Sequence, residues 1–195
     1  MLKTLRLHKA IKFAIKTHEV YQKQKRKGKD VAYIVHPMTV ALILSENKAS
    51  EDVVLAGVLH DTIEDSIQEK RVSYDMINER FGKEVADLVW SVTEKEKEDS
   101  WQKRKKKALE EIKGFSEDSL FLKSADVVSN TSELVDDYYR NKDDVFEIFN
   151  ASKEEVIEHQ LKVIQVLVDN WLDNPLKEDL KYLSFELKKM LDIEL

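Results

Sequence analysis

A histidine and an aspartate stand side by side at the end of the most hydrophobic segment of this chain. The longest uninterrupted apolar run is Val53 to Leu59, and His60-Asp61 follows it directly. Burying an unpaired carboxylate costs several kcal/mol or forces its protonation. The pair therefore needs a partner, and a bound cation is the simplest one. The alternative is a histidine hydrogen-bonded inside a core, which is the commoner state of a lone histidine on an apolar face.

Two further segments could bring ligands to the same cation. Asp126 lies in a second strongly apolar segment, and His36 comes just before a helix that has to pack nearby. Nitrogen and oxygen ligands without sulfur suit manganese, iron, zinc or cobalt. Glu64 and Asp65 follow one turn later and could orient or deprotonate a metal-bound water. Acidic pairs are also common in turns at helix ends, and that alternative stays open.

The composition predicts a mostly helical, soluble protein. The chain has 195 residues, enough for one substantial core, with 4 glycines and 2 prolines and 36% charged residues. A net charge of −6 argues against a nucleic-acid partner and favours a cytoplasmic protein. The absence of cysteine excludes disulfides and thiolate metal sites. No apolar run reaches the length of a membrane span, and the first residues lack the pattern of a secretory signal.

Helical periodicity runs through most of the chain, starting with an amphipathic helix that reaches about residue 22 to 24. Four serines are expected at helix starts, the last within a capping-box pattern: Ser50, Ser73, Ser116 and Ser152. A final helix is expected from Asn174-Pro175. We expect one all-α domain over residues 1–195, with a core at about 5–150. The C-terminal helices, about 151–195, would pack on that core and offer no recognisable chemistry.

Two basic segments could bind an anion. Lys25 to Lys27 lead directly to His36, and an arginine there could grip a phosphate bidentately, although such a run is most often a solvated loop. The segment from Trp101 to Lys105 poses the same alternatives, a phosphate site or a solvated helix face with one anchoring tryptophan. We interpret the remaining histidines, which lack converging acidic residues in the sequence, as structural: His8, His18 and His159.

Taken together, these segments resemble the HD superfamily of metal-dependent phosphohydrolases, and within it the hydrolase domain of the RelA/SpoT alarmone enzymes and their small stand-alone relatives. The resemblance covers roughly residues 5 to 150. It rests on RKGKDVAYIVHP (26–37), LAGVLHDTIEDS (55–66), FGKEVADLVWSVTE (81–94), SWQKRKKKALEEI (100–112) and LKSADVVSN (122–130).

The resemblance implies an HD-type helical bundle and assigns roles to individual positions. One divalent ion, Mn²⁺ in the alarmone hydrolases and otherwise Fe, Zn, Co or Ni, would be held by His36, His60, Asp61 and Asp126. Glu64 and Asp65 would act on the attacking water and the phosphate. The substrate would be contacted by Arg26, Lys27, Trp101, Arg104, Lys105 and Asn130.

The implied reaction is removal of pyrophosphate from a guanosine 3′-diphosphate alarmone such as ppGpp, a small nucleotide, with no nucleic-acid or membrane partner. The alternatives are a nucleoside monophosphate phosphatase of the same superfamily and a non-catalytic nucleotide sensor. Three segments depart from the family pattern. Ala32 replaces a proline, Tyr21 stands where a histidine often occurs, and ADVVSN (125–130) lacks the usual basic residue after its aspartate and the histidine before its asparagine.

Overall fold

The fold is all-α, as predicted. The computed structural model describes residues 3–95 and 99–191, and within these ranges it contains nine α-helices and no strand. The charge-dense segment before Trp101 and the predicted domain limits at 1 and 195 therefore lie partly outside the described residues. The helices are α1 (Lys3–Ile15), α2 (Val35–Glu46), α3 (Glu51–Leu59), α4 (Tyr74–Phe81), α5 (Lys83–Val92), α6 (Trp101–Ile112), α7 (Glu117–Asn141), α8 (Lys153–Asn170) and α9 (Lys177–Met190).

Serine side chains cap the helices where the sequence predicted them. The side chains of Ser50, Ser73, Ser116 and Ser152 each accept a hydrogen bond from the backbone N–H three residues on, at the starts of α3, α4, α7 and α8. Ser152 also forms the reciprocal capping box with Glu155. Ser100 caps α6 in the same way. The final helix begins at Lys177, two residues after the predicted Pro175.

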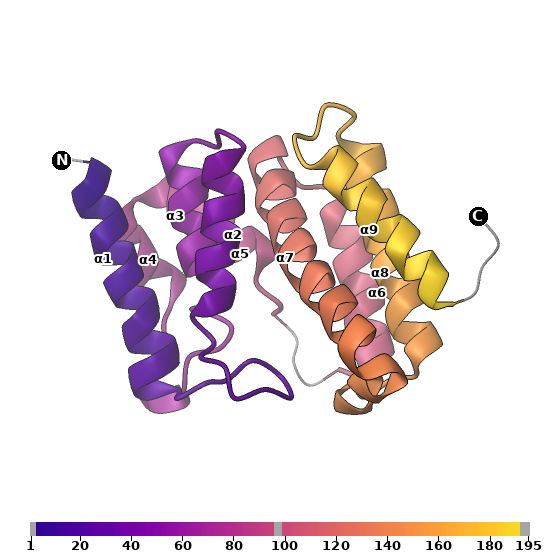
Figure 1. The fold of residues 1–195 in the computed structure, drawn as a ribbon. Coiled ribbons are helices and arrows are strands. Elements are labelled where there is room, and N and C mark those ends of the chain that lie inside the picture. The colour runs from indigo at the N-terminus through magenta and orange to yellow at the C-terminus, as the bar shows by residue number, and fades with distance from the viewer. Residues whose placement is uncertain (1–2, 96–98, 192–195) are drawn as a thin grey trace.

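Two helices connect the rest of the bundle. The short α3 is apolar around most of its circumference and packs against α1, α2, α5 and α7. The long α7 packs against α2, α3 and α5 on one side and α8 and α9 on the other. In Figure 1, α7 accordingly runs between an N-terminal group of helices and a group formed by α6, α8 and α9. Residues near the end of α3 and the middle of α7 are thereby brought together.

A glycine allows α2 and α3 to approach closely. A Cβ placed on Gly57 would lie 2.7 Å from Leu44 Cδ1 and 3.3 Å from the Cα of Ala41, both on α2. Real Cβ atoms do not approach other atoms to 2.7 Å, so any larger residue would push the helices apart. Gly57 lies one turn before His60. The close packing therefore sets the distance between the histidine of α3 and the one on α2.

The N-terminal helix ends differently from its prediction. The α-helix stops at Ile15 and is continued by a π-helix, η1, over Lys16–Tyr21, after which Lys23 adopts a left-handed conformation with φ of 51°. A loop then leads to α2. At the other end of the chain, the Asn174 side-chain amide donates to Ser124 Oγ on α7 at 2.8 Å. In the described part of the chain, no helix is both long and apolar enough to cross a membrane.

Candidate metal centre and active site

Two buried imidazoles face each other where α2, α3 and α7 meet. His36 and His60 are 3% and 4% exposed, and their Nε2 atoms lie 3.2 Å apart. His60 Nδ1 lies 2.9 Å from the Gly57 carbonyl oxygen, which can only accept, so Nδ1 carries the proton and Nε2 presents its lone pair. His36 Nδ1 lies 3.0 Å from Ser129 Oγ. Such partners orient histidine ligands in metal sites.

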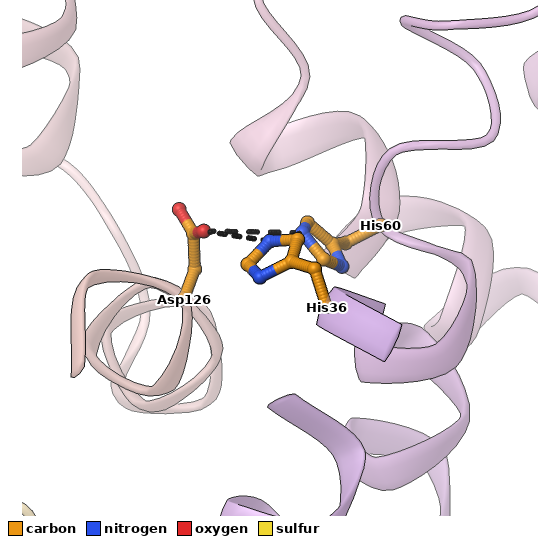
Figure 2. A group of neighbouring side chains, drawn as sticks. All are labelled: His36, His60 and Asp126. Carbon is orange, nitrogen blue, oxygen red and sulfur yellow. Dashed lines mark hydrogen bonds and ion pairs between the residues drawn. The ribbon is translucent and has the colours of Figure 1, made fainter. Parts of the chain in front are cut away.

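Two aspartates complete this group, one from α7 and one from the turn after α3. Asp126 comes from α7, and its Oδ1 lies 3.3 Å from His36 Nε2 and 3.9 Å from His60 Nε2. Figure 2 shows this carboxylate pointing at the two imidazole rings across the gap between helices. Asp61 Oδ2 lies 3.1 Å from His60 Nε2 and 3.7 Å from His36 Nε2, and it accepts a hydrogen bond of 2.6 Å from the Tyr33 hydroxyl.

The electrostatics of this group call for a positive charge between the ligands. Burial alone would lower the pKa of His60, but the negative charges of Asp61 and Asp126 outweigh it and raise the pKa to about 9. Burial would likewise raise the pKa of the Asp126 carboxyl, yet the Lys123 ammonium at 2.7 Å holds it well below its usual range. In the absence of another cation, a second proton, on His60 Nε2, balances part of the charge of the two carboxylates.

The arrangement fits a divalent metal ion. Nε2 of His36, Nε2 of His60 and a carboxylate oxygen of Asp126 all lie within 4.8 Å of one another. Ligand atoms that share one ion at about 2.1 Å lie about 3 to 3.5 Å apart, which matches the 3.2 Å and 3.3 Å separations around His36 Nε2. Neutral imidazole nitrogens and carboxylates, each oriented by a further hydrogen bond, form a suitable donor set for a first-row divalent ion.

Glu64 and Asp65 lie next to this group but face different surroundings. Glu64 lines the cavity beside the metal ligands, and its Oε2 accepts a hydrogen bond of 3.0 Å from the Glu94 backbone N–H. Asp65 does not line that cavity, and its Oδ2 accepts a hydrogen bond of 2.8 Å from the Gln24 side chain. The carboxylate that can reach a water in the cavity is therefore Glu64.

A cavity of about 420 Å³ extends from the metal ligands toward α6 and α8. Its charged end is lined by Tyr33, His36, His60, Asp61, Glu64 and Asp126. Its lining also includes a set of apolar side chains, Ile112, Phe115, Val127, Val156 and Val163. Such a cavity can hold a ligand that combines phosphate groups with an uncharged ring.

Most of the predicted substrate-binding residues reach the cavity. Its lining includes Lys27, Trp101, Arg104, Lys105 and Asn130. Glu94 pairs with both Arg104 and Lys105, the latter at 3.5 Å. Among the described residues, no carboxylate forms an ion pair with Lys27, whose ammonium lies 4.7 Å from the centre of the Phe149 ring. Burial and then the nearby Lys105 charge lower the pKa of Lys27.

Arg26 is the predicted substrate residue that does not line the cavity. Its guanidinium forms an ion pair with Glu133 and donates to Asn130 Oδ1 at 2.8 Å, and its side chain is only 13% exposed. Lys29 also pairs with Glu133, at 2.6 Å. These contacts hold the loop that carries Arg26 and Lys29 against α7. A direct contact of Arg26 with substrate would require the guanidinium to leave Glu133.

Two cavity residues were not identified from the sequence. Lys123 lies one turn before Asp126 on α7, pairs with it and lines the cavity. The negative charges of Asp126, Glu64 and Asp61 raise the pKa of Lys123 against the effect of burial. His159, interpreted from the sequence as structural, lines the cavity from α8 with its ring 5.8 Å from that of Trp101. The C-terminal region thus contributes to the cavity wall, which its sequence did not predict.

Comparison with known proteins places this chain in one family. The HD domain family model matches residues 10–157. The chain therefore belongs to the HD domain family. Among curated proteins, one similar to this chain is the guanosine-3′,5′-bis(diphosphate) 3′-pyrophosphohydrolase of Aquifex aeolicus (strain VF5). The two are 41% identical over 87 residues, a match that covers 45% of this chain and 11% of that protein. This chain is 45% identical over 75 residues to a GTP pyrophosphokinase of Myxococcus xanthus, covering 38% of this chain and 9% of that protein.

Two solved structures share the fold along most of the chain. A metazoan ortholog of SpoT, described as hydrolysing ppGpp, superposes with a TM-score of 0.72 at 22% identity, covering 97% of each chain. A protein of Listeria monocytogenes EGD-e superposes with a TM-score of 0.70 at 27% identity, covering 80% of this chain and 99% of that one. The arrangement of helices is thus shared beyond the segments that carry the sequence similarity.

Proposed function

We propose that this HD domain is a divalent-metal-dependent phosphohydrolase that removes pyrophosphate from a guanosine 3′-diphosphate alarmone such as ppGpp. The observation that carries the proposal is the convergence of His36, His60 and Asp126 within 4.8 Å at one end of a cavity large enough for a nucleotide. The names of the Aquifex relative and the metazoan structure support this choice of substrate.

We assign the metal to the nitrogens of His36 and His60 and the carboxylates of Asp61 and Asp126. A divalent ion held there, Mn²⁺ in this proposal, supplies Lewis acidity that activates water and offsets phosphate charge. Hydrogen bonds from Tyr33 to Asp61 and from Asn130 to Asp126, at 2.6 Å each, hold both carboxylates in place. The ligands are therefore oriented before substrate arrives, which reduces the reorganisation needed for reaction.

Glu64 is the group we assign to proton removal from the attacking water. It lines the cavity close to the metal ligands, and the Glu94 N–H fixes one of its oxygens, leaving the carboxylate oriented toward the cavity. Asp65 acts beside it from the same turn. Lys123, next to Asp126, supplies positive charge where the phosphate reacts.

The remaining substrate contacts follow the two chemistries of the cavity. We assign the phosphates to Lys27, Lys105 and Arg104, and the sugar to Asn130. Trp101 lies with His159 at the wall formed by α6 and α8, where the uncharged part of the substrate would pack. Arg26 contacts substrate in this proposal only if its guanidinium exchanges Glu133 for phosphate. We further infer that residues 1–195 form one domain, because α9 packs on both α7 and α8.

A panel of phosphoesters tests the proposal against its alternatives. With Mn²⁺, we expect the purified chain to release pyrophosphate from guanosine tetraphosphate and little orthophosphate from deoxynucleoside monophosphates. Orthophosphate release from a monophosphate, without alarmone cleavage, would instead assign the chain to the nucleoside monophosphate phosphatases. Nucleotide binding without turnover on the whole panel would identify a sensor.

A further inference from the structure

The end of the first helical segment contains two uncommon backbone features. Residues Lys16–Tyr21 form a π-helix, which is rare in proteins and occurs frequently at functional sites. Two residues later Lys23 has φ of 51°, a left-handed conformation that is unfavourable for a residue with a Cβ. Both features require support from surrounding contacts. His18 lies within the π-helix and is 0% exposed, and Gln24 follows Lys23 at the start of the loop.

Gln24 joins three segments that surround the candidate active site. Its backbone N–H donates to the His18 carbonyl at 2.9 Å, and its own carbonyl accepts from the Tyr33 N–H at 3.2 Å. Its side-chain Nε2 donates to Asp65 Oδ2 at 2.8 Å. Tyr33 in turn donates through its hydroxyl to Asp61. The turn that carries Asp61 and Asp65 is therefore held at both acidic residues from the same loop.

The directions of these hydrogen bonds fix the tautomer of His18. A carboxylate only accepts, so the amide nitrogen of Gln24 faces Asp65 and the amide oxygen faces His18. That oxygen lies 3.0 Å from His18 Nδ1 and also only accepts, so Nδ1 must carry the proton. Nε2 is then a bare acceptor, and it has no hydrogen-bond partner among the described residues. Burial, opposed by the Gln24 contact, lowers the pKa of His18 and keeps the ring neutral.

We propose that His18 and Gln24 are positioning residues that hold the Asp65 carboxylate and thereby the turn that presents the neighbouring Glu64 to the cavity for the hydrolytic reaction. The order of donation is His18 Nδ1–H to Gln24 Oε1, and Gln24 Nε2–H to Asp65 Oδ2. This proposal rests on the proposed function, because it gives Asp65 a role in that reaction. It also assigns a function to His18, which its sequence context had suggested was only structural. A fixed amide between the two keeps the carboxylate from rotating away from the site.

Variants at His18 and Gln24 separate orientation from folding. We expect Gln24→Leu and His18→Leu to lower kcat about 10- to 100-fold, the usual effect of removing the partner that orients an active-site group. KM should stay within about 2-fold, because no substrate contact is removed, and Mn²⁺ affinity should be unchanged. His18→Asn should recover most of the kcat, since its side-chain amide can donate from the place of Nδ1. Gln22→Leu, the same change two residues away, is the control and should leave kcat unchanged.

The outcomes distinguish this inference from the proposed function. A wild-type kcat in Gln24→Leu, or a lowered Tm without a fall in kcat, would overturn the positioning role. If wild-type protein fails to release pyrophosphate, the proposed function fails instead. The hydrogen-bond chain is then tested by ¹⁵N NMR of the histidine rings at pH 7. We expect His18 protonated at Nδ1 in the wild type and this state lost in Gln24→Leu, whereas a proton on Nε2 of wild-type His18 would overturn the inference.

Discussion

The two ends of the cavity differ in how their charges are balanced. At the end with the candidate metal ligands, each of these residues already has a partner within the fold, as when Tyr33 donates to Asp61 and Asn130 donates to Asp126. On the basic side, Lys27 faces an aromatic ring and the charge of Lys105, with no ion-pair partner among the described carboxylates. The first arrangement is preorganised, whereas the second has positive charge that an anion can neutralise.

This difference predicts different kinetic effects. Changes at the metal end should lower kcat, because they disturb groups that act only in the reaction. Changes on the basic side should raise KM, because they weaken the binding of charged phosphates. The size of this rise should depend on ionic strength, since salt screens such interactions. The following variants test whether the two ends can be separated in this way, in order of decreasing expected effect.

The largest effect is expected from Asp126→Asn. The amide keeps the shape of the side chain but removes the charge that draws a cation to the two histidines. We expect Mn²⁺ binding, measured by calorimetry, to be lost and turnover to fall about 1000-fold, equivalent to several kcal/mol of transition-state stabilisation. Asp136→Asn on the same helix is the matched control, because Asp136 pairs with the exposed Arg140 and with no other basic residue in the described part of the chain. Equal Mn²⁺ affinity in wild type and Asp126→Asn would remove Asp126 from the ligand set.

Glu64→Gln should separate metal binding from proton transfer. We expect kcat to fall about 100-fold or more, the range for loss of a general base, while Mn²⁺ affinity stays at the wild-type value. Glu69→Gln, an exposed glutamate in a nearby turn, serves as the control. A wild-type kcat for Glu64→Gln would assign proton removal to another group.

Neighbouring residues on the basic loop should give opposite results. We expect Lys27→Ala to raise KM about 10-fold, the value of one charge-assisted hydrogen bond, without changing Tm. Arg26→Ala should lower Tm by several degrees, because Glu133 and Asn130 lose the guanidinium and only Lys29 still links the loop to Glu133. If Arg26→Ala raises KM as much as Lys27→Ala and leaves Tm unchanged, the guanidinium leaves Glu133 to bind substrate.

The smallest effect concerns the wall formed by α6 and α8. Burial, then the charges of Lys105 and Lys123, lower the pKa of His159 to about 4 from its ordinary value of 6.5. The neutral ring therefore stabilises the fold fully above about pH 6.5, and this contribution is lost as the pH falls toward 4. Between pH 7.5 and pH 5, Tm should fall more for wild type than for His159→Gln, with exposed His8→Gln as the control. Parallel pH profiles would contradict a buried neutral His159.

Local features of the fold could be predicted from the sequence, and contacts between distant segments could not. Serine caps and the apolar α3 depend on neighbouring residues, so Ser50 and the segment ending at His60-Asp61 were identified correctly. Helical spacing placed His18 on the inward face, but the π-helix that contains it has no comparable sequence pattern, and neither does the pairing of Arg26 with Glu133, 107 residues away. Lys123 was missed because one lysine on a helix is ordinarily solvated.

The four predicted metal ligands illustrate the same difference between features set by neighbouring residues and contacts between distant segments. His60-Asp61 was conspicuous because polar groups end an apolar run, but His36 and Asp126 gained meaning only from the order of residues that resembles the HD superfamily. The structure brings these residues together through the close packing at Gly57 and the central position of α7. Their assignment as ligands stays a prediction until a metal is measured.

The most direct test of a metal-dependent pyrophosphohydrolase is release of pyrophosphate from guanosine tetraphosphate by wild type and Asp61→Ala, each metal-stripped and then supplied with Mn²⁺. We predict that the metal-stripped wild type is inactive and that Mn²⁺ restores its activity. Asp61→Ala should be inactive under both conditions and should fail to bind Mn²⁺. Pyrophosphate release that is unchanged by Asp61→Ala would contradict the metal mechanism.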